Sequence, residues 1–156
     1  MKKILVVLMQ VILLCACSKE QSSDVNFSLK SSGDLTKEDI NFFKDFYVKM
    51  IKAVENEDVE MSFSFYSENF MKDSEKEVLK KNIERLYSDY KNAVYVVENV
   101  SLVVKKDEAI TEDDYSYSAI PEKTSEDLKP IVLKGHERIY WRRENNLWKI
   151  YQWVYY

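Results

Sequence analysis

Hydrophobic residues recur with two different periods along the chain, and the change of period divides it into two regions. Between residues 36 and 92, apolar side chains return every three or four positions, which is the spacing of amphipathic helices. From residue 93 onward, runs rich in Val, Ile and Tyr are separated by short polar turns, which is typical of strands. The pattern therefore predicts an α+β domain in which three N-terminal helices pack on a curved antiparallel four-stranded sheet.

The helical region contains two capping boxes, and each predicts the start of a helix. Thr36 with Asp39 opens the first helix, and Ser74 with Glu77 opens the third. The apolar face of the first helix is Ile40, Phe43, Tyr47, Met50, Ile51 and Val54. A shorter second helix gathers Val59, Phe63, Tyr66 and Phe70. The face of the third helix is Val78, Leu79, Ile83, Leu86, Tyr87 and Tyr90.

The strand region predicts a four-stranded meander over residues 93–104, 109–120, 131–143 and 147–156. Asn145 and Asn146 form the tight turn of the last hairpin. That turn pairs Arg143 with Trp148, Trp141 with Ile150, and Arg138 with Trp153. Gly135 inside the third strand indicates a bulge.

Alternation along the last hairpin separates a core face from an outer face. The core face holds Ile139, Trp141, Trp148, Ile150 and Val154. We expect Trp148 and Ile150 to pack against Phe43, Tyr47 and Leu86. The outer face is aromatic and basic: His136, Arg138, Tyr140, Arg142, Lys149, Tyr151, Trp153 and Tyr155. It is either a half-exposed sheet with cation–π pairs or an interface centred on Arg138, Tyr140, Tyr151 and Trp153.

The first 16 residues have the features of a secretory signal: Lys2 and Lys3, a short apolar run, and the small residue Ala16. The Leu-Cys-Ala-Cys ending resembles the lipobox of bacterial lipoproteins. That resemblance implies cleavage before Cys17, its acylation, with palmitate for example, and anchoring in membrane lipid, with residues 17–34 as lipidated Cys and flexible tether and residues 35–156 as the domain. The alternative is an uncleaved anchor helix. In a Gram-negative host, Ser18 resembles the outer-membrane sorting pattern, on the periplasmic side or the surface.

Charge and cysteine content limit the kinds of partner and of covalent cross-link that the chain can have. Without Lys2 and Lys3, 21 basic residues face 27 acidic ones, and this negative charge argues against nucleic acid as a partner. Beyond Cys17 there is no second cysteine, so no disulfide forms within the processed chain. We expect a membrane lipid, a small apolar ligand, a second copy or an envelope protein as partners, with no cofactor and no metal.

Three short segments resemble NTF2-like domains, the family of nuclear transport factor 2 and ketosteroid isomerase. They are KAVENED at residues 52–58, SENF at 67–70 and RENNLWKI at 143–150. The resemblance covers about residues 36–156 and implies a cone with a pocket between the helices and the curved sheet. Members include isomerases, dehydratases, transport adaptors and binding domains, so fold leaves function open.

Chemistry of the isomerase type needs an acidic base in the pocket and a tyrosine or protonated acid as donor. The candidate pocket residues are Asp113, Tyr115 and His136. The alternative is that residues 112–114 form a solvated strand edge and that His136 lies on the surface. No residue is assigned as catalytic.

These features predict an exported, membrane-anchored binding module of the cell envelope. An isomerase or dehydratase and an immunity or inhibitor lipoprotein are the alternatives. A hollow cone that holds a carboxylate of raised pKa near a tyrosine would favour an enzyme. A filled cone with a conspicuous outer patch would favour protein binding.

Overall fold

The computed structural model describes residues 35–123 and 128–156. The signal, Cys17 and the tether lie outside these residues, so the predictions about them stay predictions. Within the described residues, no helix is both long and apolar enough to cross a membrane.

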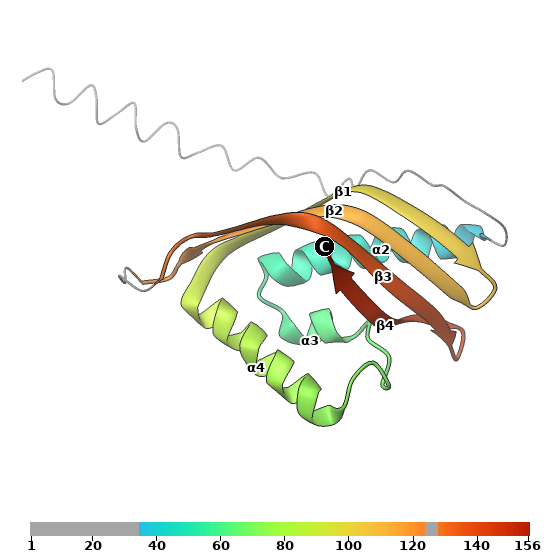
Figure 1. Cartoon of the computed structure of the whole chain (residues 1–156), viewed down its shortest axis with the longest axis horizontal. Helices are drawn as coiled ribbons and strands as arrows, with labels where there is room; N and C mark the ends of the chain where they lie inside the picture. Colours follow the sequence, from blue (N-terminus) through green and yellow to red (C-terminus); the bar gives the residue numbers. More distant parts are fainter. Residues whose placement is uncertain (1–34, 124–127) are drawn as a thin grey trace, which may run out of the picture.

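Three helices precede four strands, as the change of period predicts. The helices are α2 (Lys37–Glu55), α3 (Val59–Phe63) and α4 (Asp73–Asp89). The strands are β1 (Tyr90–Lys105), β2 (Glu108–Pro121), β3 (Ile131–Glu144) and β4 (Leu147–Tyr155). They pair antiparallel in the order β1-β2-β3-β4, and the curved sheet arches over the helices (Figure 1). The predicted α+β architecture is confirmed.

Helix α2 begins where the capping box predicts. The Thr36 hydroxyl accepts a hydrogen bond from the Asp39 amide, and the Asp39 carboxylate accepts one from the Thr36 amide, both at 3.1 Å. Its buried face is rotated from the predicted one and consists of Asp39, Phe43, Phe46, Tyr47, Met50 and Ala53. Ile40, Ile51 and Val54 are only half-buried, because the sheet covers the side of the helix on which Phe46 lies.

The second and third helices differ from the prediction. Helix α3 ends at Phe63, and the chain after it runs beside β4, where the Ser67 amide donates to the Ile150 carbonyl at 2.8 Å. The N-cap of helix α4 is Lys72, two residues before the predicted Ser74, because the Glu75 carboxylate accepts from the Lys72 amide at 3.0 Å. The predicted Ser74–Glu77 box does not form. No residue of α4 is buried. The apolar face predicted for α4 is therefore only partly covered.

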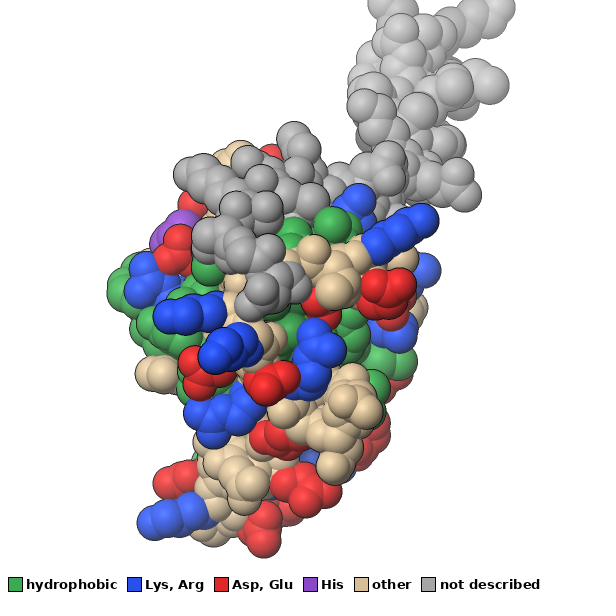
Figure 2. All heavy atoms as spheres, turned by 90° about the vertical axis from the view of Figure 1, so that its right-hand side faces the viewer, with side chains coloured by type: hydrophobic (Ala, Val, Ile, Leu, Met, Phe, Trp, Pro, Cys, Tyr) green, Lys and Arg blue, Asp and Glu red, His purple; other side chains and the backbone are tan. Residues whose placement is uncertain are grey.

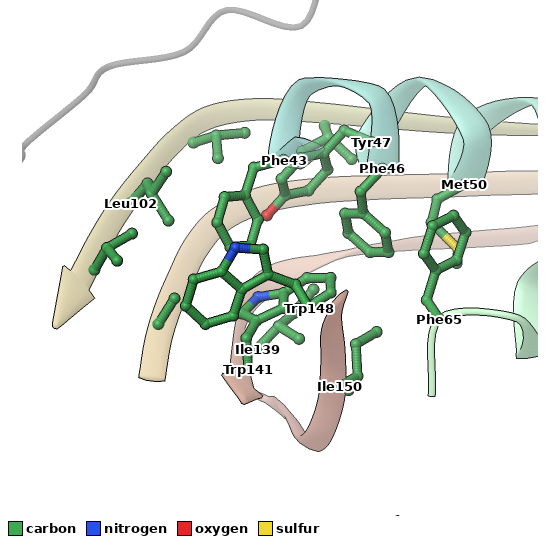
Figure 3. Close-up of a cluster of buried hydrophobic side chains, with 14 residues drawn as sticks. Phe43, Phe46, Tyr47, Met50, Phe65, Leu102, Ile139, Trp141, Trp148 and Ile150 are labelled. Carbon is green, nitrogen blue, oxygen red and sulfur yellow. The ribbon is translucent and has the colours of Figure 1, made fainter. Parts of the chain in front are cut away.

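The core joins α2 to the ends of the strands near the β1–β2 and β3–β4 turns (Figure 3). Trp141 is fully buried, and its ring meets those of Phe43 and Phe46 edge-on, with centroids 5.2 and 4.6 Å away. The predicted burial of Trp148 and Ile150 is confirmed, with 4% and 0% of their surface exposed. Leu86 does not join them, because α4 lies over the opposite end of the sheet.

Bulges lie at positions that the sequence pattern did not indicate. The register shifts in β1 between Lys91 and Val94 and between Glu98 and Ser101, and Gly135 causes no shift. Asn92 and Asn99, inside these two shifts, have positive φ values of 51° and 55°. Asparagine tolerates this backbone conformation better than most residues.

A third shift, between Tyr140 and Trp141, changes the last hairpin. The turn at Asn145 and Asn146 forms as predicted, with φ values of 50° and 64°, and Trp141 pairs with Ile150. Beyond the shift, however, Trp153 pairs with Ile139, and Arg138 pairs with Val154. The predicted pairing of Arg138 with Trp153 is wrong. Trp153 and Tyr155 consequently face the helices, whereas Val154 faces outward.

Candidate functional site

The end of the sheet covered by α4 encloses a cavity of about 410 Å³. Side chains from all four strands, α2 and α4 line it: Met50, Val54, Leu86, Tyr95, Tyr115, Tyr117, Leu133, Glu137, Trp153 and Tyr155. Leu133 and Tyr155 are 53% and 59% exposed, so they mark the rim. The cone is therefore hollow at this end and filled at the other.

Strict alternation brings the cavity residues of the strands to one face. Tyr115 and Tyr117 alternate along β2, and Leu133 and Glu137 lie on the same face of β3. Between them, Gly135 lies opposite Tyr115. A Cβ at Gly135 would lie only 2.9 Å from the Tyr115 ring and from its hydroxyl. The missing side chain therefore lets the Tyr115 ring lie across β3 in the cavity wall.

Two carboxyl groups face each other across β2 and β3 at the inner end of the cavity. Asp113 and Glu137 are direct cross-strand partners and are 0% and 1% exposed. The Tyr47 hydroxyl donates to Asp113 Oδ2 at 2.6 Å. Glu137 accepts from the Tyr95 hydroxyl at 2.8 Å and from Trp153 Nε1 at 3.0 Å. Asp113 Oδ1 has no hydrogen-bond partner among the described residues.

Burial and mutual repulsion keep a proton on this pair. Burial and the adjacent Glu137 charge raise the pKa of Asp113 to about 8. Burial also raises the pKa of Glu137, although the hydrogen bonds from Tyr95 and Trp153 oppose the rise. Two buried carboxyl groups this close do not both ionise readily. At neutral pH, the two carboxyl groups together therefore hold one proton and one negative charge.

The structure separates the three candidate pocket residues of the sequence analysis. Asp113 lies behind Glu137 at the edge of the core, and Tyr115 lies in the cavity wall. His136 is on the opposite face of β3, half exposed, with Nδ1 3.0 Å from the Asp114 carboxylate. Asp113 is not part of a solvated strand edge, although Asp114 is half exposed. The His136 ring is therefore kept out of the cavity by the alternation of β3.

Glu137 is the functional candidate that sequence reasoning missed. The sequence analysis does not name it, although it shares the alternating face of Ile139 and Trp141. That alternation was the available signal for a carboxylate on the inner face of the sheet. The Tyr95 hydroxyl that donates to Glu137 was not singled out, and Tyr47, which donates to Asp113, was expected only as a core residue, because β1 and α2 are distant from β2 and β3 in sequence.

Three of the four predicted interface residues share the outer face of the sheet. Arg138 is ion-paired with Glu112, and the Tyr140 and Tyr151 rings lie 6.1 Å apart. The Arg142 guanidinium lies 4.6 Å from the Tyr151 ring centre. Trp153 is not on this face, because of the shift in the last hairpin. At the end of the molecule seen in Figure 2, basic and acidic side chains are interleaved rather than gathered by sign.

Within residues 35–123 and 128–156, no group of three or more His, Cys, Asp and Glu side chains is placed to hold a metal ion. The groups that could act on a ligand in the cavity are its aromatic side chains, the Glu137 carboxyl group and the proton held by the pair of Asp113 and Glu137.

No protein-family model matches the chain, and no curated protein matches it in sequence. Solved structures do match. An NTF2-like superfamily protein from Salmonella enterica has a TM-score of 0.58 and 10% identity, over 72% of this chain and 85% of its own. A hexachlorocyclohexane dehydrochlorinase, LinA-type3 from Novosphingobium barchaimii, has a TM-score of 0.61 and 12% identity, over 76% and 86%.

Bd1075 from Bdellovibrio bacteriovorus has a TM-score of 0.60 and 19% identity over 78% of this chain. The match spans only 44% of the Bdellovibrio chain. At these identities the likeness concerns the fold, which is the NTF2-like cone that the sequence resemblance implied.

Proposed function

We propose that this protein is an exported lipoprotein, anchored through acylated Cys17, whose cone binds a small and largely apolar ligand. The hollow end of the cone is the observation that carries the binding proposal. Its volume of about 410 Å³ lies within the usual range for small-molecule sites. Apolar and aromatic side chains make up nearly all of its wall, with one carboxylate among them, as is typical of such sites.

Binding of the fluorescent apolar probe N-phenyl-1-naphthylamine tests this proposal. We expect saturable enhancement of its emission with the wild-type protein. Leu86→Trp should abolish the enhancement, because the larger side chain fills the cavity from α4. Val78→Trp is the matched control, since Val78 lies on the same helix but outside the cavity. Equal enhancement by the Leu86 variant and the wild type would mean that the probe binds elsewhere.

The anchoring half of the proposal is tested by labelling cells with radioactive palmitate. Cys17→Ala should leave an unprocessed precursor without label. Cys15→Ala is the matched control, because the residue before it, Leu14, is not small, and this variant should be processed and labelled normally. Label in the Cys17 variant would contradict the proposal.

A second candidate function is acid–base catalysis of the isomerase or dehydratase type. The specific observation in its favour is a buried carboxylate next to a carboxyl group of raised pKa and to the Tyr95 hydroxyl. Glu137 would act as the base: its carboxylate would take a proton from the substrate, carry it as the carboxylic acid and return it to another carbon of the substrate. Both Glu137 oxygens already accept hydrogen bonds, which lowers the basicity of the carboxylate.

Exchange of the α-hydrogens of 2-tetralone in deuterated water, followed by NMR, tests this second candidate. A base in the cone should accelerate exchange in the wild type, and Glu137→Gln should remove the acceleration. Glu112→Gln, on the outer face, is the control. Exchange at the solvent rate in the wild type would leave ligand binding as the function.

A further inference from the structure

The composition of the cavity wall points to the charge of the ligand. Five aromatic residues and one carboxylate line it: Tyr95, Tyr115, Tyr117, Trp153, Tyr155 and Glu137. No lysine or arginine is among the described lining residues. The faces of aromatic rings carry negative electrostatic potential and attract cations, most strongly where water is excluded.

The charge of Glu137 is felt throughout this end of the cone. After burial itself, it is the largest cause that raises the pKa of Tyr95, Tyr155 and Tyr66, which lie on β1, on β4 and after α3. These tyrosines therefore stay neutral donors, and the net charge of the site remains negative. A bound anion would meet this charge without a basic partner, and a neutral ligand would gain nothing from it.

We propose that the ligand of the cone is an organic cation, an ammonium or alkylated ammonium that carries an apolar group. This proposal rests on the proposed function of ligand binding. The charged head lies among the tyrosine and tryptophan faces near Glu137, and the apolar group lies against Met50, Val54 and Leu86. Rings and a carboxylate together solvate a cation that has left water.

Cation binding is coupled to the proton of the acid pair. Asp113 on β2 and Glu137 on β3 are cross-strand partners that together hold a proton, so a positive charge in the cavity favours release of that proton. The affinity for a cation therefore rises as the pH rises toward about 8. The other titratable and charged groups around Glu137 are Tyr47 on α2, Tyr66, Tyr95 on β1, Tyr155 on β4 and, on the opposite face of the sheet, His136 and Asp114.

Competition against N-phenyl-1-naphthylamine tests the charge preference. Benzyltrimethylammonium and neopentylbenzene have the same shape, but only the first is charged. With the full chain we expect the cation to displace the probe at a concentration about tenfold lower than its neutral counterpart. Glu137→Gln should remove this difference while the probe still binds, and Glu112→Gln, with its ion pair on the outer face, should keep it.

The pH dependence of cation binding can be tested with a second variant, which keeps the Glu137 carboxylate. In the wild type, we expect displacement by the cation to become about two- to fivefold more effective between about pH 6 and pH 8.5. Asp113→Asn should remove this dependence, because no proton is then shared. His136→Gln should retain this pH dependence, which would show that His136, on the opposite face of β3, is not its cause.

Each failure identifies which proposal is wrong. If the probe binds and the two competitors displace it equally, the cation inference is overturned and ligand binding stands. If neither the probe nor either competitor binds, the proposed function itself fails. Should Glu137→Gln not fold, as judged by circular dichroism, the comparison of wild type with Asp113→Asn decides, and an unchanged pH dependence in that variant overturns the inference.

Discussion

The two ends of the cone use the same sheet in opposite ways. At the closed end, α2 packs directly onto the strands, and Phe43, Trp141 and Leu102 are completely buried. At the open end, α4 covers the strands without burying any of its own residues, and tyrosines and Trp153 line a cavity instead. Stability is therefore concentrated at one end, which leaves the other free to keep a hollow interior that contains a buried carboxylate.

Bulges mark the border between the two ends. In β1, Tyr95 and Val97 face inward before the shift at Asn99, and Val100 and Leu102 face inward after it. In β4, Ile150 and Trp153 both face inward, because the extra residue lies between them. A bulge increases local twist and bends a strand, so these two shifts turn the sheet where the packed core gives way to the cavity.

The largest expected effect separates the two ends through their tryptophans. Trp148→Ala should lower the free energy of unfolding by about 3–5 kcal/mol, because a large side chain leaves a packed core. Trp153→Ala should cost clearly less, since its ring lines the cavity and is only partly buried. Denaturant unfolding of both variants measures the difference. Equal losses, or a loss below about 1 kcal/mol for Trp148, would contradict the distinction between a closed and an open end.

Asp39 should be the next most sensitive position, because it ties α2 to the last hairpin at the closed end. Its Oδ1 accepts from Arg143 at 2.7 Å and from Trp148 Nε1 at 2.8 Å. Asp39→Asn should cost about 2–4 kcal/mol at neutral pH, since a buried charged acceptor is lost beside Arg143.

The pH dependence gives the sign of this contribution. Burial raises the pKa of Asp39, but the hydrogen bonds from Trp148 and Thr36 and the charge of Arg143 outweigh it, so the pKa is lowered. The contribution is present above the ordinary carboxyl pKa and is lost as the pH falls through the lowered value. The free energies of unfolding of the wild type and the variant should therefore converge at acidic pH. A constant difference down to about pH 2 would contradict this reading.

The acid pair should show the opposite sign. Burial raises the pKa of Asp113 in the folded protein from the ordinary value of 3.8 to about 8. Between these two values the folded chain binds more protons than the unfolded one, so stability falls as the pH rises toward about 8. Asp113→Asn removes that dependence and should be more stable than wild type by about 1–3 kcal/mol at pH 9. The measurement is urea unfolding at about pH 5 and pH 9. A variant that loses the same stability as wild type across this range would show that Asp113 is ionised in the folded protein.

The smallest effect on stability is expected on the outer face. Tyr151→Glu should change the free energy of unfolding by less than about 1 kcal/mol, the loss of one cation–π contact with Arg142. If this face is a self-association surface, the variant should also weaken association. Sedimentation of the chain without residues 1–17 measures this for both proteins. A monomeric wild type at high concentration would exclude self-association and leave only a foreign partner for this face.

The elements of the fold were predictable because local patterns specify them. The Thr36 box, the Asn145-Asn146 turn and the change of hydrophobic period each depend on residues a few positions apart. The bulges were not predictable, because an extra residue in a strand leaves no repeated pattern in the sequence. The shift between Tyr140 and Trp141 was therefore missed, and Trp153 was predicted on the wrong face. The site was predicted only in part, since the pairing of Asp113 with Glu137 depends on the register between two strands.

Helix α4 has a consequence for how a ligand enters the cavity. Local opening costs least where few side chains are buried, and no residue of α4 is buried. This helix should therefore detach from the sheet at a free energy well below that of global unfolding, while α2 stays in place. Its amides should exchange with solvent deuterium before those of α2. Opening of α4 would then give a ligand access to the cavity while the packed end of the domain stays folded.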